Sequence, residues 1–147
     1  MFLKDKVQED LKVSLKTRDE VRSLTLRMLL AAIMNKEKEG KEVTEEQFLD
    51  VVLFEAKKRR EAKEAFIKGE RPELAQKEQA ELEVLLPYLP AQLTEEEIKD
   101  LAVKAIEKTG AVNQKDMGKG MGELTPQVKG KADGALVAKI VQELLVS

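Results

Sequence analysis

The chain has 147 residues, a net charge of −2, and no cysteine, histidine or tryptophan. These absences exclude disulfides, Cys/His zinc sites, thiol nucleophiles and every catalytic arrangement that needs a histidine base. Charged residues make up 37% of the chain with the two signs nearly balanced, which indicates a mixed surface without a bulk attraction to nucleic acid.

Helix-start and helix-stop signals divide the chain into seven predicted helices. In a capping box, a threonine hydroxyl accepts a hydrogen bond from a free backbone N–H of the helix. The side chain of the residue three places later accepts one from the backbone N–H of the threonine. Three segments fit this pattern, beginning at Thr17, Thr44 and Thr94. Glycines commonly follow the last helical turn, and they occur here at Gly40, Gly69 and Gly110. The predicted helices span roughly 2–16, 18–39, 45–68, 72–86, 95–109, 114–124 and 134–146.

Apolar residues follow the helical period in every long segment, and none alternates as a strand does. The sequence therefore predicts an all-α protein. In the second predicted helix this period places Val21, Leu24, Met28 and Ala32 on the side that we expect to be buried.

The segment "LPYLPAQL" contains the main break in the chain. Pro87 and Pro90 lack a backbone donor, and each disfavours helical geometry in the residue before it. We therefore predict two lobes: an N-terminal helical hairpin or bundle over 1–89, and a small C-terminal three-helix domain over 91–147.

The stretch "KDMGKGMGELTPQVKGKADG" concentrates glycines and lysines in a chain that otherwise favours helix. It matches neither the Walker A motif nor the G-x-G-x-x-G fingerprint. Asn113 is a candidate N-cap for the predicted helix 114–124, and Asp116 is the candidate second residue of its capping box. Pro126 is expected to end that helix. Gly118 and Gly122 lie on one helical face, which has no side chains at these positions and so lets another backbone come close. That backbone would belong to a neighbouring helix, or else to RNA or a protein partner.

Two groups of basic residues are candidate contacts for RNA or a partner. Lys129, Gly130 and Lys131 precede a helix that Asp133 is expected to cap, and the free N–H groups of that helix together with the lysines predict an anion site. Lys115 and Lys119 are further candidate contacts for RNA. In "KKRREAK", Lys57, Arg60 and Lys63 form either a solvated face balanced by nearby glutamates or a ridge for phosphates.

Few other residues of the chain are candidates for catalysis or for stacking on bases. No pair of carboxylates can be assigned to acid–base work, and aromatic residues are only 3% of the chain, which disfavours base-stacking platforms. We expect no catalytic residue, cofactor, metal or membrane association, and a cytoplasmic location.

Four segments occur in order along the chain: "LRMLLAAIMNKE", "EAKKRREAKEAF", "ELEVLLPYLPAQLTEEEI" and "KDMGKGMGELTPQVKGKADGALVAKIVQELL". Together they resemble the YqeY family (the GatB/YqeY domain) across essentially the whole chain. The same module is similar to the C-terminal tail of GatB, one of the subunits of the aspartyl/glutamyl-tRNA amidotransferase. The resemblance implies a two-part helical fold and a link to tRNA and translation.

Three functions follow as hypotheses. The first is an accessory module that contacts tRNA, and the second is an adaptor that docks on an amidotransferase or aminoacyl-tRNA synthetase subunit without touching RNA. The third, suggested by the resemblance, is a carbon–nitrogen ligase with glutamine as amido donor. Because the chain lacks a matching nucleophile, histidine and nucleotide motif, we do not expect it to catalyse that reaction on its own.

Overall fold

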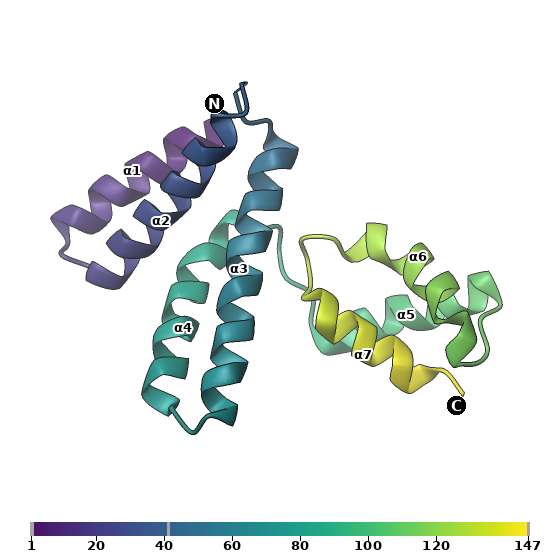
Figure 1. The fold of residues 1–147 in the computed structure, drawn as a ribbon. Coiled ribbons are helices and arrows are strands. Elements are labelled where there is room, and N and C mark those ends of the chain that lie inside the picture. The colour runs from purple at the N-terminus through teal and green to yellow at the C-terminus, as the bar shows by residue number, and fades with distance from the viewer. Residues whose placement is uncertain (1, 41, 147) are drawn as a thin grey trace. The chain divides into compact units, whose positions relative to one another are not determined.

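The structure of the protein is a computed structural model that describes residues 2–40 and 42–146. These residues form α-helices and two short 3₁₀ helices, η1 and η2, and none of them forms a strand (Figure 1). The predicted all-α class is confirmed. In chain order the elements are α1 (Phe2–Lys16), α2 (Glu20–Glu37), α3 (Glu45–Lys68), α4 (Pro72–Leu85), η1 (Leu86–Tyr88), α5 (Glu95–Thr109), η2 (Gln114–Asp116), α6 (Met117–Val128) and α7 (Gly134–Leu144).

Two of the predicted capping boxes are present, and they determine where α3 and α5 begin. The Thr44 hydroxyl accepts from the Gln47 N–H at 3.1 Å, and the Gln47 side chain accepts from the Thr44 N–H at 3.0 Å. Thr94 and Glu97 repeat this exchange at 3.1 Å in both directions. Gly110 ends α5 in the left-handed region with φ 71°, where a side chain would be strained. Both helices have the predicted bounds.

The third predicted capping box is wrong, because Asp19 rather than Thr17 caps α2. The Asp19 carboxylate accepts from the Arg22 N–H at 3.1 Å. The Thr17 N–H instead donates to the Val13 carbonyl at 3.0 Å, which closes the end of α1. Arg18 turns the chain with a positive φ of 58°, so α2 begins at Glu20 instead of residue 18.

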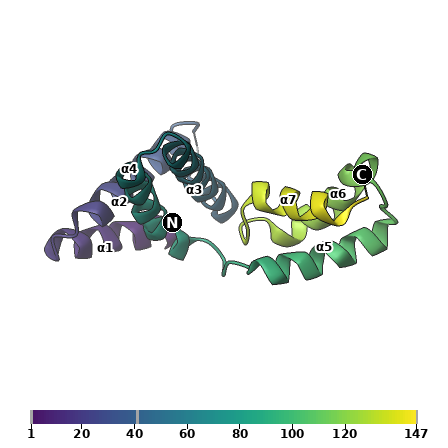
Figure 2. The same cartoon turned by 90° about the horizontal axis from the view of Figure 1, so that it is seen from below.

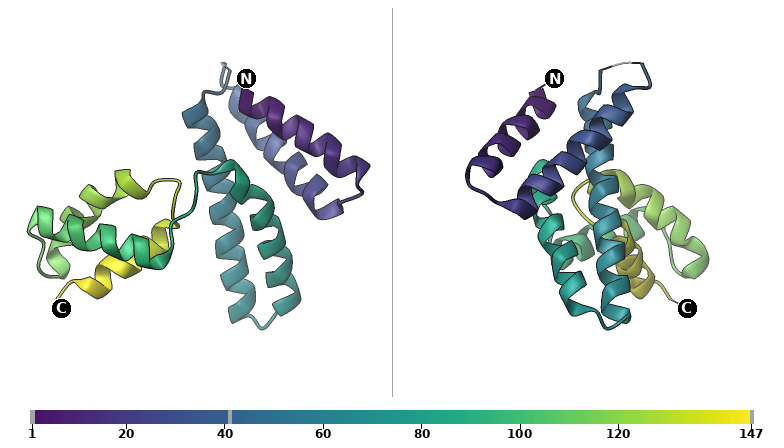
Figure 3. Two further views of the ribbon diagram at one scale, coloured as in Figure 1. Left: turned by 180° about the vertical axis from the view of Figure 1, so that it is seen from behind. Right: turned by 60° about the vertical axis from the view of Figure 1, so that its left-hand side comes forward.

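The chain divides into two compact units, Met1–Leu89 and Pro90–Ser147, here called the N-terminal and C-terminal units. In the N-terminal unit α1 and α2 form one helical hairpin and α3 and α4 form another (Figures 1 and 3). α2 joins the hairpins because it packs on both α3 and α4. The core includes the buried side chains Leu26, Leu29, Ile33, Phe48, Val52 and Leu85. Tyr88 packs edge-on against Phe48 and donates a hydrogen bond to Asp10.

The face of α2 that was predicted to be buried is mostly exposed. Val21, Leu24 and Met28 have exposed fractions of 41%, 47% and 41%, and Ala32 is half-buried. The helix is apolar on more than one side, and the fold buries the other side, which consists of Ser23, Thr25, Leu26, Leu29 and Ile33. Periodicity alone does not choose between two apolar faces of one helix.

In the C-terminal unit α5, α6 and α7 surround a small apolar core (Figure 2). Its buried residues include Ile98, Ala102, Leu124, Val137 and Val141. After α7 the chain returns to the start of η2, where the Gln114 N–H donates to the Val146 carbonyl at 3.0 Å and the Val146 N–H donates to the Val112 carbonyl at 2.9 Å. These bonds fix the segment from which α6 begins.

Candidate functional site

The segment that leads into α6 is ordered by a network of side-chain caps. The Asn113 side chain accepts from the Lys115 N–H at 3.0 Å, and the Asp116 carboxylate accepts from the Val112 N–H at 3.0 Å. The predicted pairing of Asn113 with Asp116 is therefore confirmed, although it caps η2 rather than α6 directly. The hydrogen bonds from the Val112 and Asn113 N–H groups lower the pKa of Asp116 below its ordinary value of 3.8.

Replacing Asp116 with asparagine is expected to lower the stability of the C-terminal unit at neutral pH. A carboxyl whose pKa is depressed by folding stabilises the native state above its unfolded pKa, and this stabilisation is lost as pH falls through the folded pKa. The stability difference between the wild type and the Asp116→Asn variant should therefore begin to shrink as the pH falls below about 4, and it should disappear below the folded pKa of Asp116. Thermal unfolding of both proteins between pH 3 and pH 7 measures this difference. A difference in melting temperature that stays constant over this range would contradict the expected contribution of the Asp116 carboxylate.

α6 presents an exposed face without side chains. Gly118 and Gly122 are both exposed, and a Cβ added to either would meet nothing within 4 Å. The possibility that these two glycines pack against a neighbouring helix is therefore excluded among the described residues. The packed glycine is Gly120, where a Cβ would lie 3.7 Å from Val141 Cγ1 and 3.8 Å from Ile106 Cγ1.

α6 continues past Pro126, which was expected to end it. The helix runs to Val128 with Pro126 inside it. A proline has no N–H to donate, so the carbonyl of Gly122, four residues earlier, receives no helical hydrogen bond from it. Gly122 is exposed, and water or a ligand can therefore reach this carbonyl.

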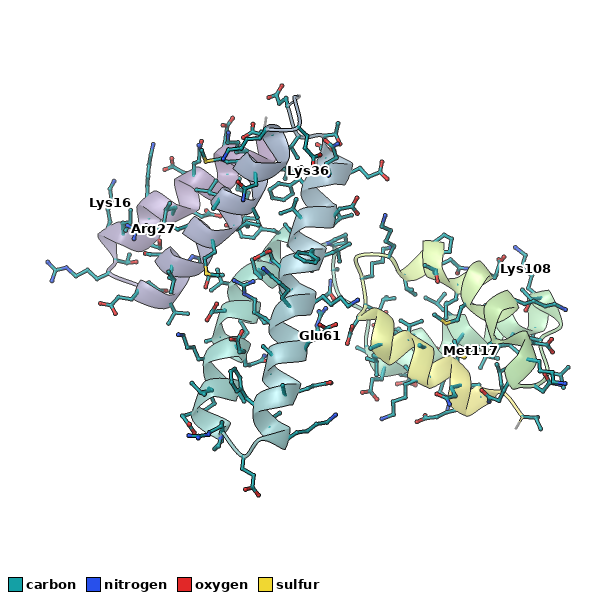
Figure 4. The ribbon with its side chains drawn as sticks, in the orientation of Figure 1. Lys16, Arg27, Lys36, Glu61, Lys108 and Met117 are labelled. Carbon is teal, nitrogen blue, oxygen red and sulfur yellow. The ribbon has the colours of Figure 1, made fainter. Side chains whose placement is uncertain are left out.

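Lysines border the open glycines. Lys115 and Lys119 are both exposed, and together with Gly118 and Gly122 they form what we call the glycine–lysine face. Lys119 lies 4.0 Å from Asp116, and its side chain is 65% exposed. The nearby Glu123 is bound by Lys108 of α5 at 2.8 Å (Lys108 is labelled in Figure 4), so its charge is already neutralised. The face therefore has an excess of positive charge.

The loop between α6 and α7 is held by residues before α5. Gly130 has a positive φ of 79°, its carbonyl accepts from the Gln92 side chain at 2.8 Å, and the Lys131 carbonyl accepts from the Leu93 N–H at 2.8 Å. Lys129 and Lys131 are exposed.

Two groups at the start of α7, where an anion site was expected, already have hydrogen-bond partners. The free backbone N–H groups before α7 were expected to bind the anion. The Lys131 N–H is not free, because it donates to the Val128 carbonyl at 2.8 Å. The Asp133 carboxylate caps α7 by accepting from the Ala135 N–H at 3.3 Å, so a negative charge already occupies this helix end. The exposed side chain of Lys131 is a group at this helix end that could meet a phosphate.

The basic segment of α3 does not form one free ridge. Lys57 lies 3.9 Å from Glu61 on an exposed surface, Arg60 is half-buried, and Lys63 donates to the Gln79 side chain of α4 at 2.8 Å. Lys63 therefore points toward α4 and does not share a stripe with Lys57.

A buried charge cluster within the same segment was missed by the sequence reasoning. Arg59 is only 3% exposed, and its guanidinium donates to the Glu55 carboxylate at 2.9 Å and lies 3.5 Å from the carboxylate of Glu81. A run of basic residues suggests an exposed surface. The sequence signal that could have indicated burial of Arg59 was Glu55, four residues earlier on the same helix, but the second carboxylate, Glu81, lies on α4. This cluster joins α3 to α4 and does not face the solvent.

Within residues 2–40 and 42–146, no group of three or more carboxylates could hold a metal ion. No helix in this part of the chain is long and apolar enough to cross a lipid bilayer.

The fold and the site define a two-unit helical protein with an exposed glycine–lysine helix face. A family model for Yqey-like proteins matches residues 4–145, and the chain belongs to this family. The predicted family is confirmed.

Five of the fungal proteins that are similar to the chain are called "Altered inheritance of mitochondria protein 41, mitochondrial". The protein of Pyrenophora tritici-repentis is 30% identical over 145 residues, which is 95% of this chain and 79% of that protein. The Eremothecium gossypii protein is 33% identical over 101 residues, 67% of this chain and 55% of the relative. The names of these relatives place them in mitochondria, which contradicts the expected cytoplasmic location.

Proposed function

We propose that this protein is an accessory module of translation that binds tRNA through the glycine–lysine face of α6. The observation that carries the proposal is the open backbone at Gly118 and Gly122, bordered by the exposed Lys115 and Lys119. A helix face without side chains lets a phosphate–sugar backbone approach closely, and lysines at its border attract the phosphates.

The local charge supports this proposal even though the whole chain has a net charge of −2. Residues 113–131 contain four lysines and two acidic residues, so their net charge is 4 − 2 = +2. Because aromatic residues are only 3% of the chain, recognition by base stacking is disfavoured. The proposed mode of binding is therefore contact with the tRNA backbone, with Lys129 and Lys131 as additional contacts.

The resemblance to the tail of an amidotransferase subunit supports tRNA as the kind of RNA. In this proposal the module helps to hold tRNA, and a partner enzyme carries out any amide transfer. The net charge of −2 favours a second candidate, an adaptor that uses the same open face to dock on an amidotransferase or synthetase subunit without touching RNA.

Replacing Lys115 and Lys119 together with alanine is expected to weaken tRNA binding without unfolding the protein, because both side chains are exposed. If both contact phosphates, the slope of log affinity against log salt should become shallower by about 1.4 to 1.8. Filter binding from 20 to 200 mM salt would measure both quantities.

The matched control is Lys104→Ala with Lys139→Ala, which removes the same charge from exposed positions on α5 and α7. This control should leave the salt slope nearly unchanged. Equal losses in the two double variants would show that only net charge matters and would contradict a site on α6.

A further inference from the structure

α2 carries an apolar stripe that the N-terminal unit leaves uncovered. The residues Val21, Leu24 and Met28 follow one another at spacings of three and four, and each is more than 40% exposed. The exposed Ala31 continues the stripe by another turn. Scattered exposed apolar residues are normal on protein surfaces, but a stripe over about three turns, roughly 15 Å long, is a contiguous surface.

Two hollows lie along this stripe. One has a volume of about 310 Å³ and is lined by Leu15, Arg18, Glu20, Ser23, Leu24 and Arg27. The other has a volume of about 860 Å³, and its apolar lining comes from Met28, Ala31, Ala32, Val51 and Phe54. Leu24 and Met28 are one helical turn apart, so the hollows follow one another along the same helix. Phe54 of α3 is 61% exposed and forms the far wall of the larger hollow.

The charges at the two hollows differ. At the larger hollow the cations are already paired: Lys36 lies 3.1 Å from Glu39, and Lys58 lies 3.0 Å from Glu55. At the smaller hollow neither Arg18 nor Arg27 forms an ion pair with a described residue, and both are exposed (Arg27 is labelled in Figure 4). Because Glu20 is the one acidic residue in the lining, this hollow has one more basic than acidic side chain.

We propose that this stripe of α2 is the docking site for an acidic amphipathic helix of a partner protein. The apolar face of that helix would cover Val21, Leu24 and Met28 and fill the hollow beside Phe54, in the manner of helices that bind in grooves. Its acidic residues would meet Arg18 and Arg27, where opposite charges speed association and select the partner. The site lies in the N-terminal unit and is independent of the proposed tRNA contact.

The site can be tested with the photo-crosslinker p-benzoylphenylalanine in cells that naturally make this protein. It would be placed in the full chain at Leu24, at Phe54 and, as a control, at Ile67, which is 57% exposed but lies in neither hollow. We expect Leu24 and Phe54, but not Ile67, to crosslink to the same partner segment. That segment should have an apolar helical stripe with acidic residues beside it.

A synthetic peptide of the crosslinked segment should bind the purified protein, and the Arg18→Glu, Arg27→Glu double variant should weaken binding about tenfold or more. Circular dichroism of the variant would verify that it is folded. Crosslinking to a second copy of this chain, to lipid, to RNA or to a basic segment would overturn the proposal. So would no crosslink at Leu24 and Phe54, or a peptide affinity that the charge reversal does not change.

Discussion

Replacing Arg59 with methionine is expected to destabilise the N-terminal unit by about 3 kcal/mol. The guanidinium is 3% exposed and lies between the carboxylates of Glu55 and Glu81, which are themselves buried. In the variant Glu55 keeps Lys58 at 3.0 Å, whereas Glu81 loses its only ion-pair partner among the described residues. A buried carboxylate without a counter-charge strongly disfavours the folded state.

Urea unfolding followed by tyrosine fluorescence measures this change, because the chain's single tyrosine, Tyr88, packs in the N-terminal unit. Arg60→Met is the matched control, since Arg60 is half-buried and has no ion pair within the described residues, and it should change stability by less than about 1 kcal/mol. Adding Glu55→Leu and Glu81→Leu to the Arg59 variant should recover most of the lost stability. An Arg59→Met protein as stable as the wild type would contradict the assignment of a buried cluster.

Leucine at Gly118 and leucine at Gly120 are expected to change stability in opposite directions. At Gly118 nothing lies within 4 Å of an added Cβ, so Gly118→Leu should stabilise α6 by up to about 1 kcal/mol through helix propensity. At Gly120 an added Cβ already contacts Val141 and Ile106, and the further carbons of leucine would overfill this space. Gly120→Leu should therefore lower stability by about 1–3 kcal/mol.

Thermal unfolding by circular dichroism would measure both variants, and the Tyr88 signal of the N-terminal unit would serve as an internal reference. If Gly118→Leu is as destabilising as Gly120→Leu, the face of α6 is not open in solution. That result would also remove the structural basis for a ligand site there.

Local signals in the sequence were sufficient to predict much of the helical framework. The side chains of Thr44 and Thr94 each form their caps with a residue three places away, so α3 and α5 could be bounded from short segments. At Thr17 the same pattern failed because Asp19 is a competing cap two residues later. Pro126 failed as a stop because a helix tolerates a proline when the carbonyl that loses its donor is exposed, as at Gly122.

Features that depend on packing between helices could not be predicted in this way. Whether Gly118 or Gly120 faces the core depends on how α6 is rotated against α5 and α7, which glycine spacing alone does not determine. The burial of Arg59 requires Glu81, which lies on another helix, and the exposure of Leu24 depends on which apolar side of α2 meets α3 and α4. The candidate site residues stay a prediction from the sequence, and the structure adds which of them lie on an open surface.

The most direct test of the proposed function is a titration of fluorescently labelled tRNA with the wild-type protein, followed by anisotropy at 20 mM and at 200 mM salt. We predict saturable binding at low salt that weakens at high salt, because lysine contacts release counterions from the phosphates. Gly118→Leu should weaken this binding although the protein is at least as stable, since a leucine would block the approach to the helix backbone. No measurable binding of wild-type protein to tRNA at 20 mM salt would contradict the account and leave the adaptor function in its place.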